Sequence, residues 1–199
     1  LHKPSLATPT AWVEGARTGG SQMLANGDFA QGTNNWQLSQ HKTATGALEV
    51  LNENSDGKPC AKVNVTTAGD VRWHVMLTQR NFVLKKDMIY RVAFKAKASA
   101  SRSVTVEVCH ADPWRGCGSA SVEVGAAWQD FQFTFAAPED DDQVRLSFQL
   151  AEAKGTIWIA DALLHEAPIH GLREDEDPRQ GTVRRLEPSE FGGCAPARF

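Results

Sequence analysis

The 199-residue sequence lacks the features that mark several classes of protein. No segment approaches the run of about 20 apolar residues that a membrane-spanning helix requires. Its 21 basic and 24 acidic residues give a formal charge of -3, whereas a protein that binds nucleic acid or an anionic membrane presents a basic surface. The sequence also has no G-x-S-x-G, no H-E-x-x-H and no glycine-rich phosphate loop. We therefore expect no nucleic acid or membrane as a partner, and no catalytic activity.

Helical periodicity is also missing, because no segment keeps apolar residues at helical spacing for three turns. Short runs of Val, Ile, Phe, Trp and Thr alternate instead with polar residues, and Gly, Pro, Asn and Asp separate them. The pattern predicts strands at 47–51, 59–65, 72–79, 89–97, 104–109, 119–124, 128–136, 143–150 and 156–165. So many short strands predict an all-β protein with a two-sheet antiparallel β-sandwich.

The two ends of the chain differ from its middle in composition. Residues 1–22 read as an N-terminal leader segment without the apolar stretch of a signal peptide, so we expect a mature or excised piece. Residues 23–167 contain every predicted strand. Residues 168–199 are rich in charge, Pro and Gly, which is typical of a C-terminal extension or linker.

The four cysteines lack the C-x-x-C spacing of redox centres and zinc ribbons. Strand alternation puts Cys109 and Cys117 on one polar face of two strands joined by a short loop, where opposed side chains approach to about 5 Å. This predicts a Cys109–Cys117 disulfide and leaves Cys60–Cys194 to staple the C-terminal segment to the sandwich. Disulfides favour a secreted protein, extracellular or periplasmic.

Several motifs follow one another in an order that has a known counterpart. The opening N-G-D-F…G…W, at Asn26, Gly27, Asp28, Phe29, Gly32 and Trp36, precedes an aromatic strand around Trp73, "MIYRVAFKAKA" (88–98), "WQDFQFTF" (128–135), "VRLSFQL" (144–150) and "GTIWIADALL" (155–164). In this order they resemble carbohydrate-binding modules of the family 4, 9 and 22 type, which occur beside glycoside hydrolase domains. The resemblance implies a jelly-roll topology with a shallow or cleft-like sugar site on one sheet.

Under that fold, the strands at 72–79, 104–109, 119–124 and 143–150 share the binding sheet. The outward polar side chains of that sheet can hydrogen-bond to sugar hydroxyls. They are Thr105, Glu107, Ser119, Ser121, Glu123, Arg145, Ser147 and Gln149. We expect Arg72, Glu107, Arg145 and Gln149 to select the glycan chain.

The tryptophans divide into binding candidates and packing residues. Trp73 is a candidate to stack on a sugar ring, although alternation also fits it to the core with Val75 and Leu77, in which case Arg72 and His74 would point outward. Trp114 lies at the tip of the 109–117 loop beside Arg115, and is predicted to be a sugar platform or to pack on a neighbouring loop. Trp36 and Trp128 are interpreted as core, and Trp158 as packing under the leader or the C-terminal segment.

Asp28 and Asp161 match positions around the family's structural calcium site, where carboxylates and carbonyls are the ligands. Ala30 stands where the family usually has an acidic residue, so one ligand is missing. Calcium is therefore expected as a structural cofactor, at a site that has one carboxylate ligand fewer than in the family.

The interpretation is a noncatalytic module that binds polysaccharide or oligosaccharide and targets an attached glycoside hydrolase or lyase. One alternative is a jelly roll that has lost its sugar site and packs against a neighbouring domain. Another is a polysaccharide-cleaving enzyme that uses Glu107 and Glu123 as acid and base, although paired surface carboxylates are common on sheets and the E-x-D-x-x-E motif of jelly-roll glucanases is absent.

Overall fold

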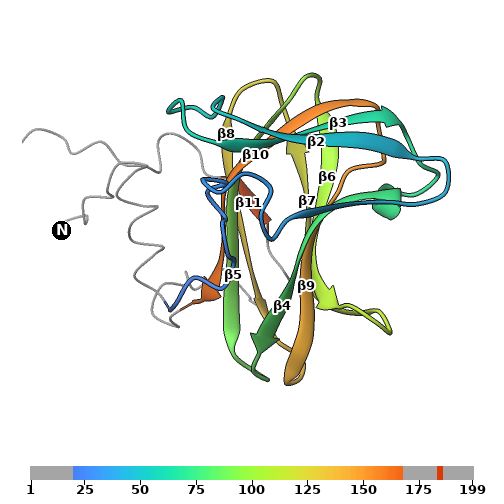
Figure 1. Cartoon of the computed structure of the whole chain (residues 1–199). Helices are drawn as coiled ribbons and strands as arrows, with labels where there is room; N and C mark the ends of the chain where they lie inside the picture. The colour runs from blue at the N-terminus through green and yellow to red at the C-terminus, as the bar shows by residue number, and fades with distance from the viewer. Residues whose placement is uncertain (1–19, 168–182, 186–199) are drawn as a thin grey trace, which may run out of the picture.

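The computed structural model describes residues 20–167 and 183–185, which form two antiparallel sheets (Figure 1). The two sheets share one hydrophobic core. Sheet A has the strand order β1 (Gln37–Gln40), β4 (Val75–Leu84), β9 (Asp141–Gln149), β6 (Arg102–His110), β7 (Arg115–Val124). Sheet B has the order β11 (Val183–Arg185), β8 (Gln129–Ala136), β5 (Ile89–Ala98), β10 (Gly155–Glu166), β3 (Cys60–Thr67), β2 (Thr45–Leu51). A turn of 3-10 helix, η1 (Arg72–His74), precedes β4. The predicted all-β jelly-roll sandwich is confirmed.

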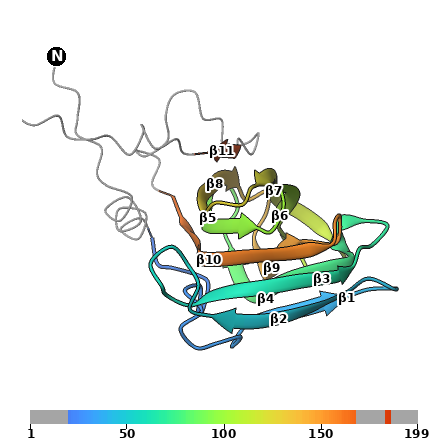
Figure 2. The same ribbon diagram turned by 90° about the horizontal axis from the view of Figure 1, so that it is seen from above.

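The distribution of strands between the sheets also agrees with what the family resemblance implied. β4, β6, β7 and β9 share sheet A, and β3, β5, β8 and β10 share sheet B, where Figure 2 shows β10, β3 and β2 side by side. β1 and β11 were not predicted, and β11 adds residues 183–185 to the edge of β8, inside the expected linker. Within the described part of the chain, no helix is long and apolar enough to cross a membrane. Cys194, and with it the Cys60–Cys194 prediction, lies outside the described residues.

The core forms where the inward rows of the two sheets meet. Phe94 of sheet B stacks on Phe131 at 5.3 Å between ring centroids and meets Phe148 of sheet A edge-on at 5.1 Å. Trp36 is buried and its ring centroid lies 5.2 Å from that of Phe29, which confirms its core interpretation. This closely packed aromatic layer fixes the distance between the two sheets. It therefore holds the strands of sheet A, and the side chains on their outward face, in place.

Trp128 and Trp158 lie half-buried on the outward face of sheet B. The core prediction for Trp128 was wrong, because the inward phenylalanines of β8 are at odd positions and Trp128 falls on the other side of the alternation. Lys97 Nζ lies 5.1 Å from the ring centroid of Trp128 and 4.8 Å from that of Trp158. Trp158 Nε1 also donates to Glu53 Oε2 at 2.9 Å. The ammonium of Lys97 therefore covers both indoles.

Candidate functional site

Trp73 points outward because it lies on η1 and not on a strand. A 3-10 turn advances about 120° per residue, which leaves the Trp73 side chain 44% exposed and turns His74 inward to 1% exposure. Edge contacts hold the indole, with ring centroids 4.5 Å from His74 and 5.5 Å from His41. The prediction that His74 contacts a ligand was therefore wrong, since His74 supports Trp73 from behind.

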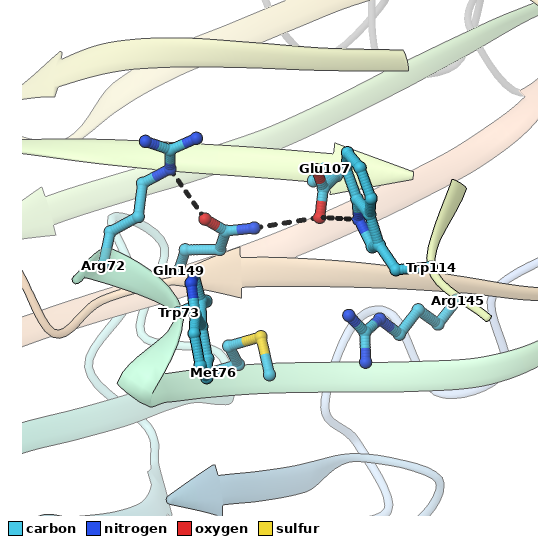
Figure 3. A pocket seen from close by; sticks show the side chains of 7 residues that line it. All are labelled: Arg72, Trp73, Met76, Glu107, Trp114, Arg145 and Gln149. Carbon is cyan, nitrogen blue, oxygen red and sulfur yellow. Dashed lines mark hydrogen bonds between the residues drawn. The ribbon is translucent and has the colours of Figure 1, made fainter. Parts of the chain in front are cut away.

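Glu107 on β6, Gln149 on β9 and Arg72 on η1 form a hydrogen-bonded bridge across sheet A (Figure 3). Arg72 Nε donates to Gln149 Oε1 at 2.8 Å, and Gln149 Nε2 donates to Glu107 Oε2 at 2.9 Å. Gln149 and Glu107 are buried, so these bonds satisfy polar groups that would otherwise be costly to desolvate. The bridge fixes the carboxylate and the amide in one orientation before any ligand arrives.

Trp114 stands at the tip of the loop between β6 and β7, with its side chain 61% exposed. Its Nε1 donates to Glu107 Oε2 at 3.4 Å, which orients the indole over the sheet. At the base of the loop, His110 Nδ1 lies 2.8 Å from Asp141 Oδ1 and Arg115 Nε lies 3.2 Å from Glu139 Oε1. These contacts anchor the loop without a covalent link. They also direct Arg115, predicted to bind a ligand, toward Glu139.

Cys109 and Cys117 are free thiols, so the predicted disulfide between them was wrong. A β-bulge at Val108 and Cys109 shifts the register and places Cys109 opposite Gly116. The inserted residue, Cys117, packs against the hydrophobic core, while Cys109 lies on the outward side of the sheet beside Arg145. The two thiols consequently sit on opposite faces of one sheet, and the even cysteine count was misleading.

Arg145 on β9 reaches the site from the strand next to Cys109. Its Nε donates to Cys109 Sγ at 3.3 Å, and its guanidinium is directed into the space between Trp114 and Met76 (Figure 3). Cys109 is fully buried, and this burial raises the pKa of its thiol to about 11. Cys109 therefore stays protonated at neutral pH and acts as a neutral support for Arg145.

These side chains enclose a cavity of about 430 Å³ on the outward face of sheet A. Trp73 and Trp114 stand on opposite sides of it, with the Gln149–Glu107 bridge between them (Figure 3). The structure brings six predicted residues to this cavity: Arg72, Trp73, Glu107, Trp114, Arg145 and Gln149. Met76, which pairs with Gln149, was missed. Its position between the core residues Val75 and Leu77 was the signal that could have found it.

The remaining polar side chains of the predicted row do not line the cavity. Thr105 and Ser121 bond to each other, with 2.8 Å between their hydroxyl oxygens, and Ser147 is fully buried. Ser119 and Glu123 project from β7, and Glu123 pairs with Ser103, four residues along β6 from Glu107. That spacing corresponds to about 13 Å along the strands, beyond the separations of the carboxyl pairs in glycosidases.

The residues predicted to hold calcium are engaged within the protein. Asp161 lies in the bulge of β10, with its Oδ2 3.2 Å from Lys95 Nζ, so a cation already faces this carboxylate. Asp28 Oδ1 accepts a hydrogen bond from the backbone of Ala30 at 3.2 Å. In residues 20–167 and 183–185, no three His, Cys, Asp or Glu side chains form a group that could hold a metal ion. The arrangement fits calcium poorly, and calcium stays a prediction.

Comparisons with known proteins agree with this architecture. A sequence profile of the family CBM_4_9, described as a carbohydrate binding domain, matches residues 21–155. A solved structure described as "CBM4 structure and function" is 27% identical, with a TM-score of 0.63, and the match covers 72% of this chain and 99% of that one. The CBM22-1 xylan-binding domain of Xyn10C from Paenibacillus barcinonensis is 16% identical, with a TM-score of 0.54 over 75% of this chain and 98% of that one. No curated protein sequence matches significantly.

Proposed function

The chain belongs to the CBM_4_9 family of carbohydrate binding domains, and we propose that it binds a polysaccharide chain in the cavity between Trp73 and Trp114. The observation that carries the proposal is the pair of exposed indoles on either side of a fixed polar floor. Indole faces stack on the C–H faces of sugar rings, and hydrogen-bonding groups between them read the hydroxyls. The chain is a carbohydrate-binding module, and this cavity is its proposed site.

The polar floor supplies both donors and acceptors for sugar hydroxyls. The Glu107 carboxylate has about four lone-pair positions, of which Gln149 and Trp114 use two. Among the hydrogen bonds of the described residues, Arg72 donates only through its Nε, to Gln149. Its two terminal guanidinium nitrogens can therefore donate to a ligand. A bound sugar would thus meet polar groups that need no rearrangement, which limits the entropy lost on binding.

We propose that the domain is noncatalytic. The wide spacing of Glu107 and Glu123 supports this proposal, as does the burial of Glu107 in a hydrogen-bonded bridge. The Glu107→Gln variant distinguishes glycan binding from catalysis. Glycan cleavage by the parent protein that is lost in this variant, measured as the release of reducing ends or unsaturated products, would contradict the proposal. Weakened binding without any cleavage in the parent protein is the expected result.

We also propose that the module is exported and attached to a glycoside hydrolase or lyase. A polysaccharide outside the cell can be reached only by an exported protein, and this is the remaining support for export, because Cys109 and Cys117 are free thiols and form no disulfide. Immunodetection in culture medium and cell fractions would test the location. The mass of the detected species would reveal an attached domain.

Affinity electrophoresis through gels that contain xylan, mixed-linkage β-glucan, laminarin, mannan or pectic polymers tests the binding proposal. We expect retardation by at least one polymer, and its loss in Trp114→Ala. Trp158→Ala, which removes an indole from the outward face of sheet B, is the matched control and should behave as the parent. Equal mobility of the parent protein in all these gels, and in gels with every further polysaccharide tested, would contradict the proposal.

A further inference from the structure

Two arginines face each other on the outward side of sheet A. β4 and β9 pair so that Arg80 lies directly opposite Arg145. Like charges directly opposite each other on neighbouring strands destabilise a sheet. The repulsion between the two guanidinium groups therefore opposes folding. The stability of the fold does not explain why both arginines are present, which points to a role in binding.

In the described part of the chain, acidic side chains form ion pairs with other basic residues of the surface, but not with Arg80 or Arg145. Arg115, for example, lies 3.2 Å from Glu139. Among the described residues, no carboxylate oxygen forms an ion pair within 4.0 Å of Arg72, Arg80 or Arg145. The chain as a whole is acidic, with a formal charge of -3, so arginines without an acidic partner on the outward side of sheet A, two of them at the cavity, contrast with its average composition.

Among the residues that the structure describes, Glu107 is the one carboxylate that lines the cavity, and hydrogen bonds from Gln149 and Trp114 already engage it. Arg72 and Arg145 line the same cavity. The two guanidinium groups outnumber the carboxylate, so the cavity carries a net positive charge. Its walls include the indoles of Trp73 and Trp114, which would shield a stacked sugar from water and so strengthen electrostatic attraction to it.

We propose that the glycan of this module is anionic, and that Arg145 binds a carboxylate of an acidic sugar whose ring stacks on Trp114. The inference rests on the proposed function, because it names the class of glycan bound at that site. A guanidinium matches carboxylate oxygens in a two-pronged geometry, and such charge-assisted bonds are stronger than neutral ones. A sulfate ester offers similar anionic oxygens, so the shared requirement is negative charge on the sugar chain.

A second cavity extends the positive surface along β4. It has a volume of about 340 Å³, and Gln37, Thr78 and Arg80 contribute to its lining. Met76 of the first cavity and Thr78 and Arg80 of the second alternate on one strand, so they share its outward side. A chain of several acidic sugars that lies along β4 would bring one negative charge to Arg145 and another to Arg80.

Affinity electrophoresis followed by calorimetry tests the inference. The anionic probes are polygalacturonate, alginate, glucuronoxylan and a sulfated galactan, and the neutral probes are laminarin, mixed-linkage β-glucan and glucomannan. We expect at least one anionic polymer to bind more tightly than every neutral one, and its affinity to fall with added salt, because exposed charges are screened. Reduction of its carboxyl groups to alcohols, or removal of its sulfate esters, should lower the affinity at least about tenfold. The polymer that binds identifies the anion.

The outcomes separate the inference from the function on which it rests. Tight binding of a neutral polymer, unchanged by salt and by Arg145→Gln, would overturn the inference and leave the proposed function standing. Failure to bind any polymer would overturn both.

Arginine variants locate the charge requirement. Arg80→Gln and Arg145→Gln should each lower the affinity for the anionic polymer about tenfold and reduce its salt dependence. Lys62→Gln, on sheet B, is the control and should bind as the parent. Arg80→Gln should melt at the same temperature as the parent or higher, because it removes a like charge opposite Arg145. Unchanged affinity in both arginine variants would overturn the inference.

Discussion

Replacement of Trp114 by alanine is the perturbation whose effect the structure predicts most quantitatively. The side chain is 61% exposed, which for an indole corresponds to roughly 150 Å² of accessible surface. A sugar that stacks on one face would cover about half of this area, or about 75 Å². At about 25 cal/mol per Å² the lost burial amounts to roughly 1.9 kcal/mol, or a rise in Kd of about 20-fold. The fold should not change, because the indole is not part of the core.

Calorimetry with an oligosaccharide of a polymer that binds would measure this change, alongside the melting temperatures of parent and variant. Trp114→Phe is an informative intermediate, since it keeps an aromatic face but loses the hydrogen bond to Glu107, and its loss of affinity should be smaller. An unchanged Kd in Trp114→Ala, with the melting temperature also unchanged, would refute the stacking role of this loop.

The remaining predictions concern the supports of the site. Trp73→Ala should weaken binding to a similar extent in calorimetry, and a fall in melting temperature without loss of affinity would instead make Trp73 a packing residue. Burial raises the Cys109 pKa from 9.0 to about 11, so the unfolded state loses this proton first as pH rises. The free energy of unfolding, from denaturant titration, should then fall between pH 9 and 11, and fall less in Cys109→Ala; parallel curves would contradict this. Calcium at Asp161 would appear as a melting temperature that rises with millimolar calcium in the parent but not in Asp161→Asn, and no rise would leave Lys95 as the cation of that carboxylate.

Alternation of side chains was enough to predict most strands and their inward faces, because a strand buried on one face repeats its apolar residues every two positions, whereas the division of the strands between two sheets came from the family resemblance. The row of Val144, Leu146 and Phe148 is inward as predicted, and the same rule put Glu107, Arg145 and Gln149 on the outward face, where the cavity lies.

The errors occurred where the backbone leaves strand geometry for one or two residues. The 3-10 turn at η1 directs His74 inward, against the prediction that it contacts a ligand, and the bulge near Cys109 moved Cys117 to the inward side. The bulge depends on the register of the β6–β7 hairpin, and η1 is held by backbone bonds from His41 and Ala151, so local propensity did not reveal either irregularity. The hydrogen bond from Trp114 to Glu107 depends on the path of the loop between β6 and β7, which side-chain alternation does not describe.

The central claim is that a glycan binds between Trp73 and Trp114, and NMR titration tests it most directly. The chain has six tryptophans, so its indole N–H signals form a small set that single Trp→Phe variants can assign. An oligosaccharide of the polymer that retards the protein should shift the signals of Trp73 and Trp114, and leave those of Trp36, Trp128 and Trp158 in place. Shifts confined to Trp128 and Trp158 would place the binding surface on sheet B and contradict the account.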